Sequence, residues 1–180
     1  MARTTATVSF QALELKGSLL PASLLEEVSK FNRPKELLLE AADYGLTKGE
    51  RLRDRIDAAW VLTKELWEEY TNLKERAGES TAGLHFGQRF LKEVLDWGDV
   101  QPCNGWQHGE SAYPITHRAF GGAVPLILRG IDAAELDRGS SQFGQDGRKR
   151  SAHSCLQECL NADDNANWGL LLSSDRLRLL

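Results

Sequence analysis

The end of the chain constrains the fold most, because it has the pattern of a β-hairpin. The apolar residues Trp168 to Leu172 are followed by Ser173 to Asp175, which have turn composition, and by the alternating segment Arg176 to Leu180. A hairpin needs a core against one face and protected edges, so we expect a larger sheet beside it. The second strand runs to the last residue, and we therefore expect these 180 residues to be one piece of a longer protein.

The composition is that of a globular protein without a membrane segment. Hydrophobic residues make up 41% of the chain and charged residues 27%, which supplies enough apolar material for a core. The net charge of -4 argues against nucleic-acid binding over the whole surface, although it allows a local basic patch. The three cysteines lack the spacing of a disulfide framework, and the N-terminus lacks the pattern of a signal peptide. A cytoplasmic location with no membrane partner is the simplest interpretation.

Two regions follow from the distribution of breaks and periodic segments. Residues 1–46 are predicted to form an N-terminal arm, with a strand at Thr4 to Phe10 and a short helix at Ala22 to Ser29. Pro34 ends that helical region, because the residue before a proline is pushed out of the α conformation. Residues 47–180 are predicted to form the main module.

The longest predicted helix starts at Thr47, which forms a capping box with Glu50, and ends at Gly78. Its apolar stripe includes two tryptophans and a tyrosine, which we interpret as core and not as a platform for stacking bases. The residues that recur at three- and four-residue steps are Leu52, Ile56, Ala59, Trp60, Thr63, Leu66, Trp67, Tyr70 and Leu73.

The rest of the module is predicted to alternate between helices and strands. Ser80 or Thr81 caps a helix that extends to about Trp97, and Ser151 caps another that extends to about Asn161. The segment from Gly130 to Gly147 is polar and glycine-rich, which is typical of a surface loop. The predicted strands before the terminal hairpin are Val100 to Cys103, Ala112 to His117 and Ala123 to Arg129.

The resulting order is helix, three strands, helix, strand. This is the order of the restriction-endonuclease-like core, an α/β (α+β) fold in which a mixed sheet is flanked by helices. With residues 1–46 as an N-terminal arm, this is the fold class that we predict.

The catalytic residues of such a nuclease are missing from the expected strands. The chemistry needs an acidic residue near the second strand, and an acidic residue and a lysine one apart on the third, to hold magnesium and activate water. The third predicted strand has Ile127 where the carboxylate belongs and Arg129 where the lysine belongs, and the second has no acid. We therefore assign no catalytic residue and no metal site. An active magnesium-dependent endonuclease would have to use other acids, such as Glu110, Asp132, Glu135, Asp137 or Glu158.

The cysteines and histidines do not have the spacing of a zinc site. Cys155 and Cys159 lie four residues apart on one predicted helix, with His153 near its start, and Cys103 and His108 lie far away in the sequence. Structural zinc sites take a closely spaced pair of ligands from each of two turns. We expect buried thiols.

Basic residues give the strongest indication of a partner. Arg148, Lys149 and Arg150 lead directly into Ser151 at a predicted helix N-terminus, where exposed N–H groups and cations together favour a phosphate. Arg176 and Arg178 lie on one face of the last strand and would extend such a patch. The alternative is a solvated loop end, which is the usual environment of a charge run.

A set of segments distributed over most of the chain can be compared with known families. The segments are Leu46 to Ile56 with Trp60, Tyr113 to His117, Val124 to Leu126, Arg150 to Ser154, Leu156 to Glu158, Leu160 to Asn161, Trp168 to Leu170 and Arg176 to Leu180. In their order and spacing these segments resemble the N-terminal region of large type IIG-like restriction–modification DNA methyltransferases and of their relatives in the BREX and DISARM phage-defence systems.

The resemblance implies that the full-length enzyme methylates adenine N6 in DNA with S-adenosylmethionine. The glycine-rich cofactor loop and the Asn-Pro-Pro-Tyr/Phe segment of such enzymes do not occur in these 180 residues, so we expect no cofactor in this chain. The expected role is a nuclease-like scaffold that contacts DNA or a protein subunit of a defence complex. A pure protein-interaction module remains the alternative.

Overall fold

The computed structural model describes residues 22–29, 40–173 and 175–180. The chain divides into two compact units, residues 1–54 and 55–180. In the first unit, the predicted short helix is confirmed as α1 (Ala22–Ser29), and the predicted strand from Thr4 to Phe10 lies outside the described residues.

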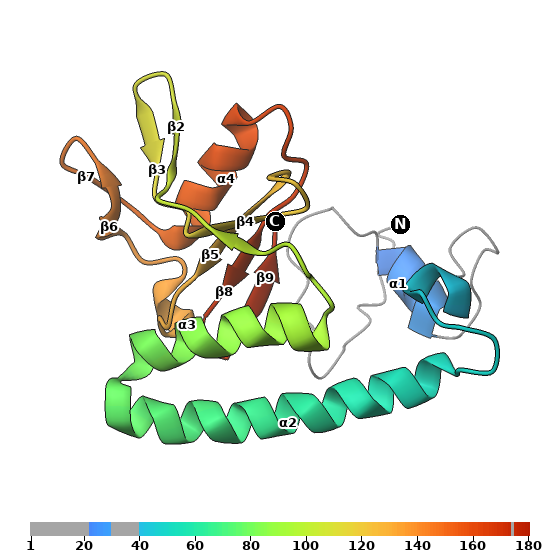
Figure 1. Cartoon of the computed structure of the whole chain (residues 1–180). Helices are drawn as coiled ribbons and strands as arrows, with labels where there is room; N and C mark the ends of the chain where they lie inside the picture. The colour runs from blue at the N-terminus through green and yellow to red at the C-terminus, as the bar shows by residue number, and fades with distance from the viewer. Residues whose placement is uncertain (1–21, 30–39, 174) are drawn as a thin grey trace, which may run out of the picture. The chain divides into compact units, whose positions relative to one another are not determined.

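The second unit contains most of the regular structure (Figure 1). The helical elements after α1 are η2 (Ala41–Tyr44), α2 (Leu52–Ala77), α3 (Glu79–Arg89), the π-helix η3 (Phe90–Val94), η4 (Ala133–Glu135) and α4 (Ala152–Ala162). The strands are β1 (Gln101–Pro102), β2 (Trp106–His108), β3 (Ser111–Tyr113), β4 (His117–Ala119), β5 (Val124–Leu128), β6 (Ser140–Gln145), β7 (Arg148–Arg150), β8 (Leu170–Leu172) and β9 (Leu177–Leu179).

A five-stranded mixed sheet with the order β1-β4-β5-β8-β9 forms the centre of this unit. Neighbouring strands are antiparallel except β5 and β8, which are parallel and are connected through α4. A parallel pair needs such a crossover, because a short turn cannot return the chain to the same end of the sheet. The predicted α/β class with a mixed sheet and flanking helices is confirmed.

Helices cover both faces of the sheet. Side chains alternate between the two faces along each strand, so apolar residues of one strand pack on both sides. Ile127 and Leu171 point to the face covered by α4, where Leu156 is fully buried. Leu126 and Leu170 point to the opposite face and pack with Leu91 from η3. The sheet is therefore the middle layer of a helix–sheet–helix arrangement.

Helix α2 packs against α3 through only part of its predicted stripe. Leu66 and Tyr70 are buried against Phe86 of α3. In contrast, Ile56 is 58% exposed and Trp60 is 62% exposed. The prediction that the whole stripe is core is therefore wrong for the N-terminal half of α2, which extends past the end of its contact with α3.

The starts of two helices differ from the predictions. Thr47 does bond to Glu50, whose carboxylate accepts from the Thr47 backbone N–H at 2.5 Å, but this pair belongs to a turn and α2 begins at Leu52. The N-cap of α3 is Gly78, with φ of +82°, and not Ser80 or Thr81. Glycine adopts this conformation without steric cost, which allows Gly78 to be the single residue between α2 and α3.

The predicted loop from Gly130 to Gly147 is wrong, because it contains the helical turn η4 and the strand β6. Strand β6 pairs with β7 as a separate two-stranded sheet. Phe143 is the one fully buried residue of β6, and the others are serine, glutamine and glycine. Without apolar alternation this strand gives no sequence signal.

The terminal hairpin is confirmed as β8 and β9. Leu177 and Leu179 lie directly opposite Leu172 and Leu170 and are 45% and 49% exposed at the sheet edge. Arg178 points to the opposite face, toward α4. Within the residues that the structure describes, no helix is both long enough and apolar enough to span a membrane.

Candidate nucleic-acid interface

Two small hairpins, β2–β3 and β6–β7, project from the central sheet beside α4 (Figure 1). The turn of the second hairpin contains Asp146 and Gly147, with φ of +52° and +78°. Two consecutive residues with positive φ match the right-handed twist of a tight hairpin. Arg148 and Lys149 follow this turn, and both are exposed.

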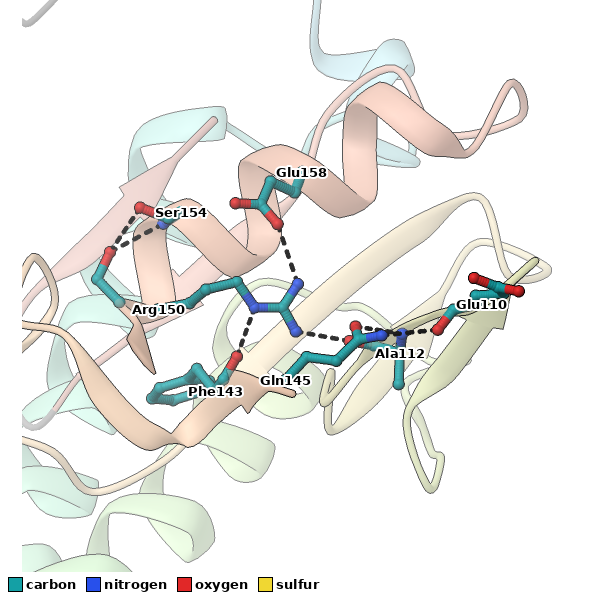
Figure 2. Close-up of polar contacts among 8 residues, drawn as sticks. Glu110, Ala112, Phe143, Gln145, Arg150, Ser154 and Glu158 are labelled. Carbon is teal, nitrogen blue, oxygen red and sulfur yellow. Dashed lines mark hydrogen bonds and ion pairs between the residues drawn. The ribbon is translucent and has the colours of Figure 1, made fainter. Parts of the chain in front are cut away.

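Arg150 is buried, unlike its two basic neighbours. Its guanidinium donates from Nε to the Phe143 carbonyl oxygen at 2.6 Å and from Nη2 to the Ala112 carbonyl oxygen at 2.6 Å (Figure 2). Nη1 pairs with the Glu158 carboxylate at 3.0 Å, and the group lies 5.5 Å from the centre of the Tyr113 ring. The expectation of a DNA contact at Arg150 therefore conflicts with its position, because its guanidinium joins three segments of the protein.

Gln145 provides a second connection between the hairpins. Its side-chain oxygen accepts from the Ala112 backbone N–H at 2.9 Å, and its side-chain nitrogen donates to the Glu110 carbonyl oxygen at 2.6 Å (Figure 2). Arg150 and Gln145 thus hold β6–β7 against β3 with side-chain bonds. This arrangement fixes the strand that carries Arg148 and Lys149.

The N-terminus of α4 does not offer open N–H groups, contrary to the expected phosphate site. Ser151 is confirmed as the N-cap, and its hydroxyl accepts from the Ser154 N–H at 3.0 Å. The His153 N–H donates to the Leu136 carbonyl oxygen at 3.0 Å. Ser151 itself is 6% exposed. Phosphate binding in this region would therefore depend on side chains and not on the helix end.

The two arginines of the terminal hairpin have separate environments. Arg178 makes a two-bond pair with Asp137, at 2.6 and 3.0 Å, and its Nη1 lies 3.2 Å from His153 Nδ1. Arg176 is exposed, and its backbone N–H donates to the Ser173 hydroxyl at 3.0 Å. Of the predicted basic residues, Arg148 and Lys149 are consecutive and exposed on β7, where their side chains point to opposite faces of the strand, whereas Arg178 is held by an acidic partner.

The strands that would carry a nuclease site lack carboxylates. Strand β5 is buried throughout and apolar, and β4 begins with His117, which is 3% exposed. Gln88 Nε2 lies 2.9 Å from His117 Nε2, and Thr116 Oγ1 lies 2.9 Å from Nδ1. Burial, and secondarily the charge of Lys92, lower the pKa of His117. This group is a neutral, hydrogen-bonded imidazole inside the core.

The acids that an active endonuclease would have to use instead are dispersed, and several of them make other contacts. Asp137 and Glu158 pair with arginines, and the Asp132 carboxylate caps η4 by accepting from the Ala134 N–H at 2.8 Å. Glu110 and Glu135 are exposed. Within the described parts of the chain, no three histidine, cysteine or acidic side chains are arranged to hold a metal ion.

The prediction of buried thiols is confirmed for two cysteines. Cys155 and Cys159 are fully buried between α4 and the sheet, and burial raises their pKa values to about 11 and about 12. Cys103 is partly buried, and burial raises its pKa as well. Thiols with such values are protonated at neutral pH and are poor nucleophiles.

One further feature, which sequence reasoning missed, is a hollow between the two hairpins. It has a volume of about 360 Å³, and Trp106 and Tyr113 are among the residues that line it. These two rings are directly opposite each other on β2 and β3, with centroids 5.4 Å apart. In the sequence these two residues lie seven positions apart around a glycine-containing turn, and this spacing could have indicated that they pair across a hairpin.

Comparison with known proteins gives no assignment: no protein-family model, curated protein or solved structure matches this chain.

Proposed function

We propose that this chain is a DNA-contacting scaffold module, and that the β6–β7 hairpin binds the phosphate backbone through Arg148 and Lys149. The observation that carries the proposal is the position of these two side chains, exposed on a hairpin that the buried Arg150 fastens to α4 and β3. Because the strand is already fixed, binding a phosphate through these residues costs little backbone entropy.

The topology supports a nuclease-like core whose central strands lack the carboxylates of a nuclease site. Helix α3 precedes the antiparallel strands β1, β4 and β5, and α4 then leads to β8, which is parallel to β5. This order agrees with a restriction-endonuclease-like arrangement, and the absence of carboxylates from β4 and β5 favours a scaffold over a hydrolase. The assignment to a restriction–modification methyltransferase of a phage-defence system rests on the sequence resemblance.

Salt-dependent DNA binding tests the proposal. Fluorescence anisotropy with a labelled duplex gives the affinity at several salt concentrations, and each phosphate contact contributes about 0.9 to the slope of log affinity against log salt. We expect Arg148→Ala/Lys149→Ala to weaken binding for every duplex sequence and to reduce this slope by about 2.

The matched control removes the same charge elsewhere. Lys64 and Arg76 are exposed on α2, and Lys64→Ala/Arg76→Ala should leave both the affinity and the slope unchanged. Equal effects of the two double variants would mean that only net charge matters and would contradict a site on the hairpin.

A second function, protein binding, is favoured by α2. Ile56, Trp60 and Trp67 are 58%, 62% and 42% exposed, and they follow one another along the helix at intervals of four and seven residues. An exposed apolar stripe of this kind is typical of a helix that docks on a partner. Trp60→Ser should abolish co-purification of a subunit while leaving DNA binding intact.

A further inference from the structure

The hollow between the hairpins has the size and lining of a ligand site. Its volume of about 360 Å³ lies within the range of small-molecule pockets, about 300 to 1,000 Å³. Three residues with side-chain amides, Asn104, Gln107 and Gln142, contribute to its lining, and all three are exposed. No acidic or basic residue lines it.

Aromatic rings form a stack at one wall. The Trp106 ring lies between the rings of His108 and Tyr113. Both ring centroids lie 5.4 Å from that of Trp106, and the interplanar angles are 28° for His108 and 29° for Tyr113. Arg150 lies over the Tyr113 ring at 5.5 Å, and Arg118 lies over the central Trp106 ring at 5.4 Å. These contacts hold the rings in place, and His108 remains exposed at the end of the stack.

The hollow adjoins the basic strand directly. Gly144 lies so close to the β7 backbone that an added Cβ would stand 2.5 Å from the Arg148 carbonyl oxygen. Gly144 also lines the hollow. A ligand in the hollow would therefore lie next to the strand that bears Arg148 and Lys149.

These features together match one chemical class. A nucleobase is flat, neutral and carries adjacent donors and acceptors, which aromatic rings and side-chain amides recognise by stacking and paired hydrogen bonds. A base within a duplex is inaccessible to such a hollow, because its faces are covered by its neighbours.

We infer that the hollow takes an unpaired nucleobase of a DNA strand whose phosphates lie on Arg148 and Lys149. This inference rests on the proposed function, because the hairpin holds the backbone while the hollow receives the base. The amides of Asn104 and Gln142 bond to the base edge, while Trp106 and Tyr113, whose faces are held by each other and by neighbouring groups, form a fixed wall of the hollow. The module would then prefer DNA with a bulge or an extruded base over a perfect duplex.

The test compares two labelled duplexes that differ by one unpaired adenine. Each net hydrogen bond from an amide to the base edge is worth about 0.5 to 1.5 kcal/mol, so we expect the two amides to make the full chain bind the bulged duplex about tenfold more tightly than the paired one. Asn104→Leu/Gln142→Leu keeps the size of both side chains and removes their hydrogen bonds. This variant should lose most of the tenfold preference and retain the affinity and salt slope for the paired duplex.

Two controls separate the hollow from the hairpin. Gln157→Leu removes an exposed amide on α4 and should retain the preference. Arg148→Ala/Lys149→Ala should weaken both duplexes by the same factor and so retain the preference as well.

Equal wild-type affinity for the two duplexes would overturn the inference, and salt-dependent binding to both would leave the proposed function standing. A preference that survives Asn104→Leu/Gln142→Leu would also overturn it, because the base would then lie elsewhere. If free adenosine monophosphate displaces the bulged duplex at micromolar concentration, the hollow binds a free nucleotide, and the inference that its ligand is a base of a DNA strand is overturned. Failure to bind either duplex would overturn both proposals.

Discussion

Arg150 joins three segments of the candidate interface. Its guanidinium bonds to Phe143 in β6, Ala112 in β3 and Glu158 in α4. Arg150→Leu would leave the two carbonyl oxygens without donors, and each such loss costs about 1 to 3 kcal/mol. We expect the free energy of unfolding, measured with urea, to fall by about 3 kcal/mol.

The neighbouring residue supplies the comparison for Arg150. Arg148 is exposed, so Arg148→Leu should change the free energy of unfolding by no more than about 0.5 kcal/mol. Similar losses in the two variants would mean that the hairpin is not fastened through Arg150.

His117 makes stability depend on pH. Burial lowers its pKa in the folded state, so the unfolded chain takes up a proton first as the pH falls below the ordinary value of about 6.5. The contribution of His117 to stability is therefore present above pH 6.5 and decreases as the pH falls toward the folded pKa. We expect urea midpoints to fall between pH 7 and pH 5, and His117→Gln to flatten this dependence.

The hydrogen bonds explain why the neutral form suits this position. With the amide nitrogen of Gln88 as donor to Nε2, the proton of the ring lies on Nδ1 and is donated to Thr116. Protonation would place an N–H against the amide group. His85→Gln, at an exposed position, is the matched control and should retain the pH dependence of the wild type.

Among the elements, α3 closely approaches the backbone of the segment that follows β5. A Cβ on Gly83 would lie 2.5 Å from the Gly130 Cα, and a Cβ on Gly130 would lie 1.9 Å from the Glu79 carbonyl oxygen. Alanine is normally the better helix former by about 1 kcal/mol, but Gly83→Ala would push α3 away from the sheet. We expect a net loss of about 2 kcal/mol in the free energy of unfolding.

Gly98 provides the control for this prediction, because an added Cβ there meets nothing within 4 Å. Gly98→Ala should leave the urea midpoint almost unchanged. An unchanged midpoint for Gly83→Ala would contradict the close approach of α3 to the segment that follows β5.

Elements that depend on residues close to them in the sequence could be predicted, whereas elements held by contacts with distant residues could not. The start of α4 was predicted correctly, because Ser151 caps it and apolar residues recur at helical spacing. Strand β6 was missed, because contacts from Gln145 and Arg150 hold it in place and its own side chains are mostly polar. Gly78 was interpreted only as the end of a helix, although it is also the N-cap of α3.

The same distinction applies to the candidate site. The exposure of Arg148 and Lys149 is what a charge run predicts. The burial of Arg150 depends on Ala112, which is 38 residues away, and no local pattern contains that contact. The hollow beside Trp106 likewise exists only because two hairpins distant in sequence lie together.

At the scale of the whole molecule, the two halves of α2 should respond differently to substitution. Leu66 is 2% exposed, so Leu66→Ala should cost about 3 kcal/mol in the free energy of unfolding. Trp60 is 62% exposed, and Trp60→Ser should cost less than about 0.5 kcal/mol in urea unfolding of the isolated chain. A large, concentration-dependent cost at Trp60 would mean instead that the stripe is covered by a second copy.

The two hairpins form their own small sheets and share no strand with the five-stranded sheet. Side-chain bonds from Gln145 and Arg150, together with the buried rings of Phe143 and Tyr113, attach the hairpins to the apolar core between the helices and the large sheet. Natural selection can therefore alter the turns, lengths and exposed residues of the hairpins without disturbing the core. Related modules would be expected to diverge fastest in these hairpins, and a transplanted β2–β3 or β6–β7 segment that keeps its anchoring residues could give the same framework a different binding preference.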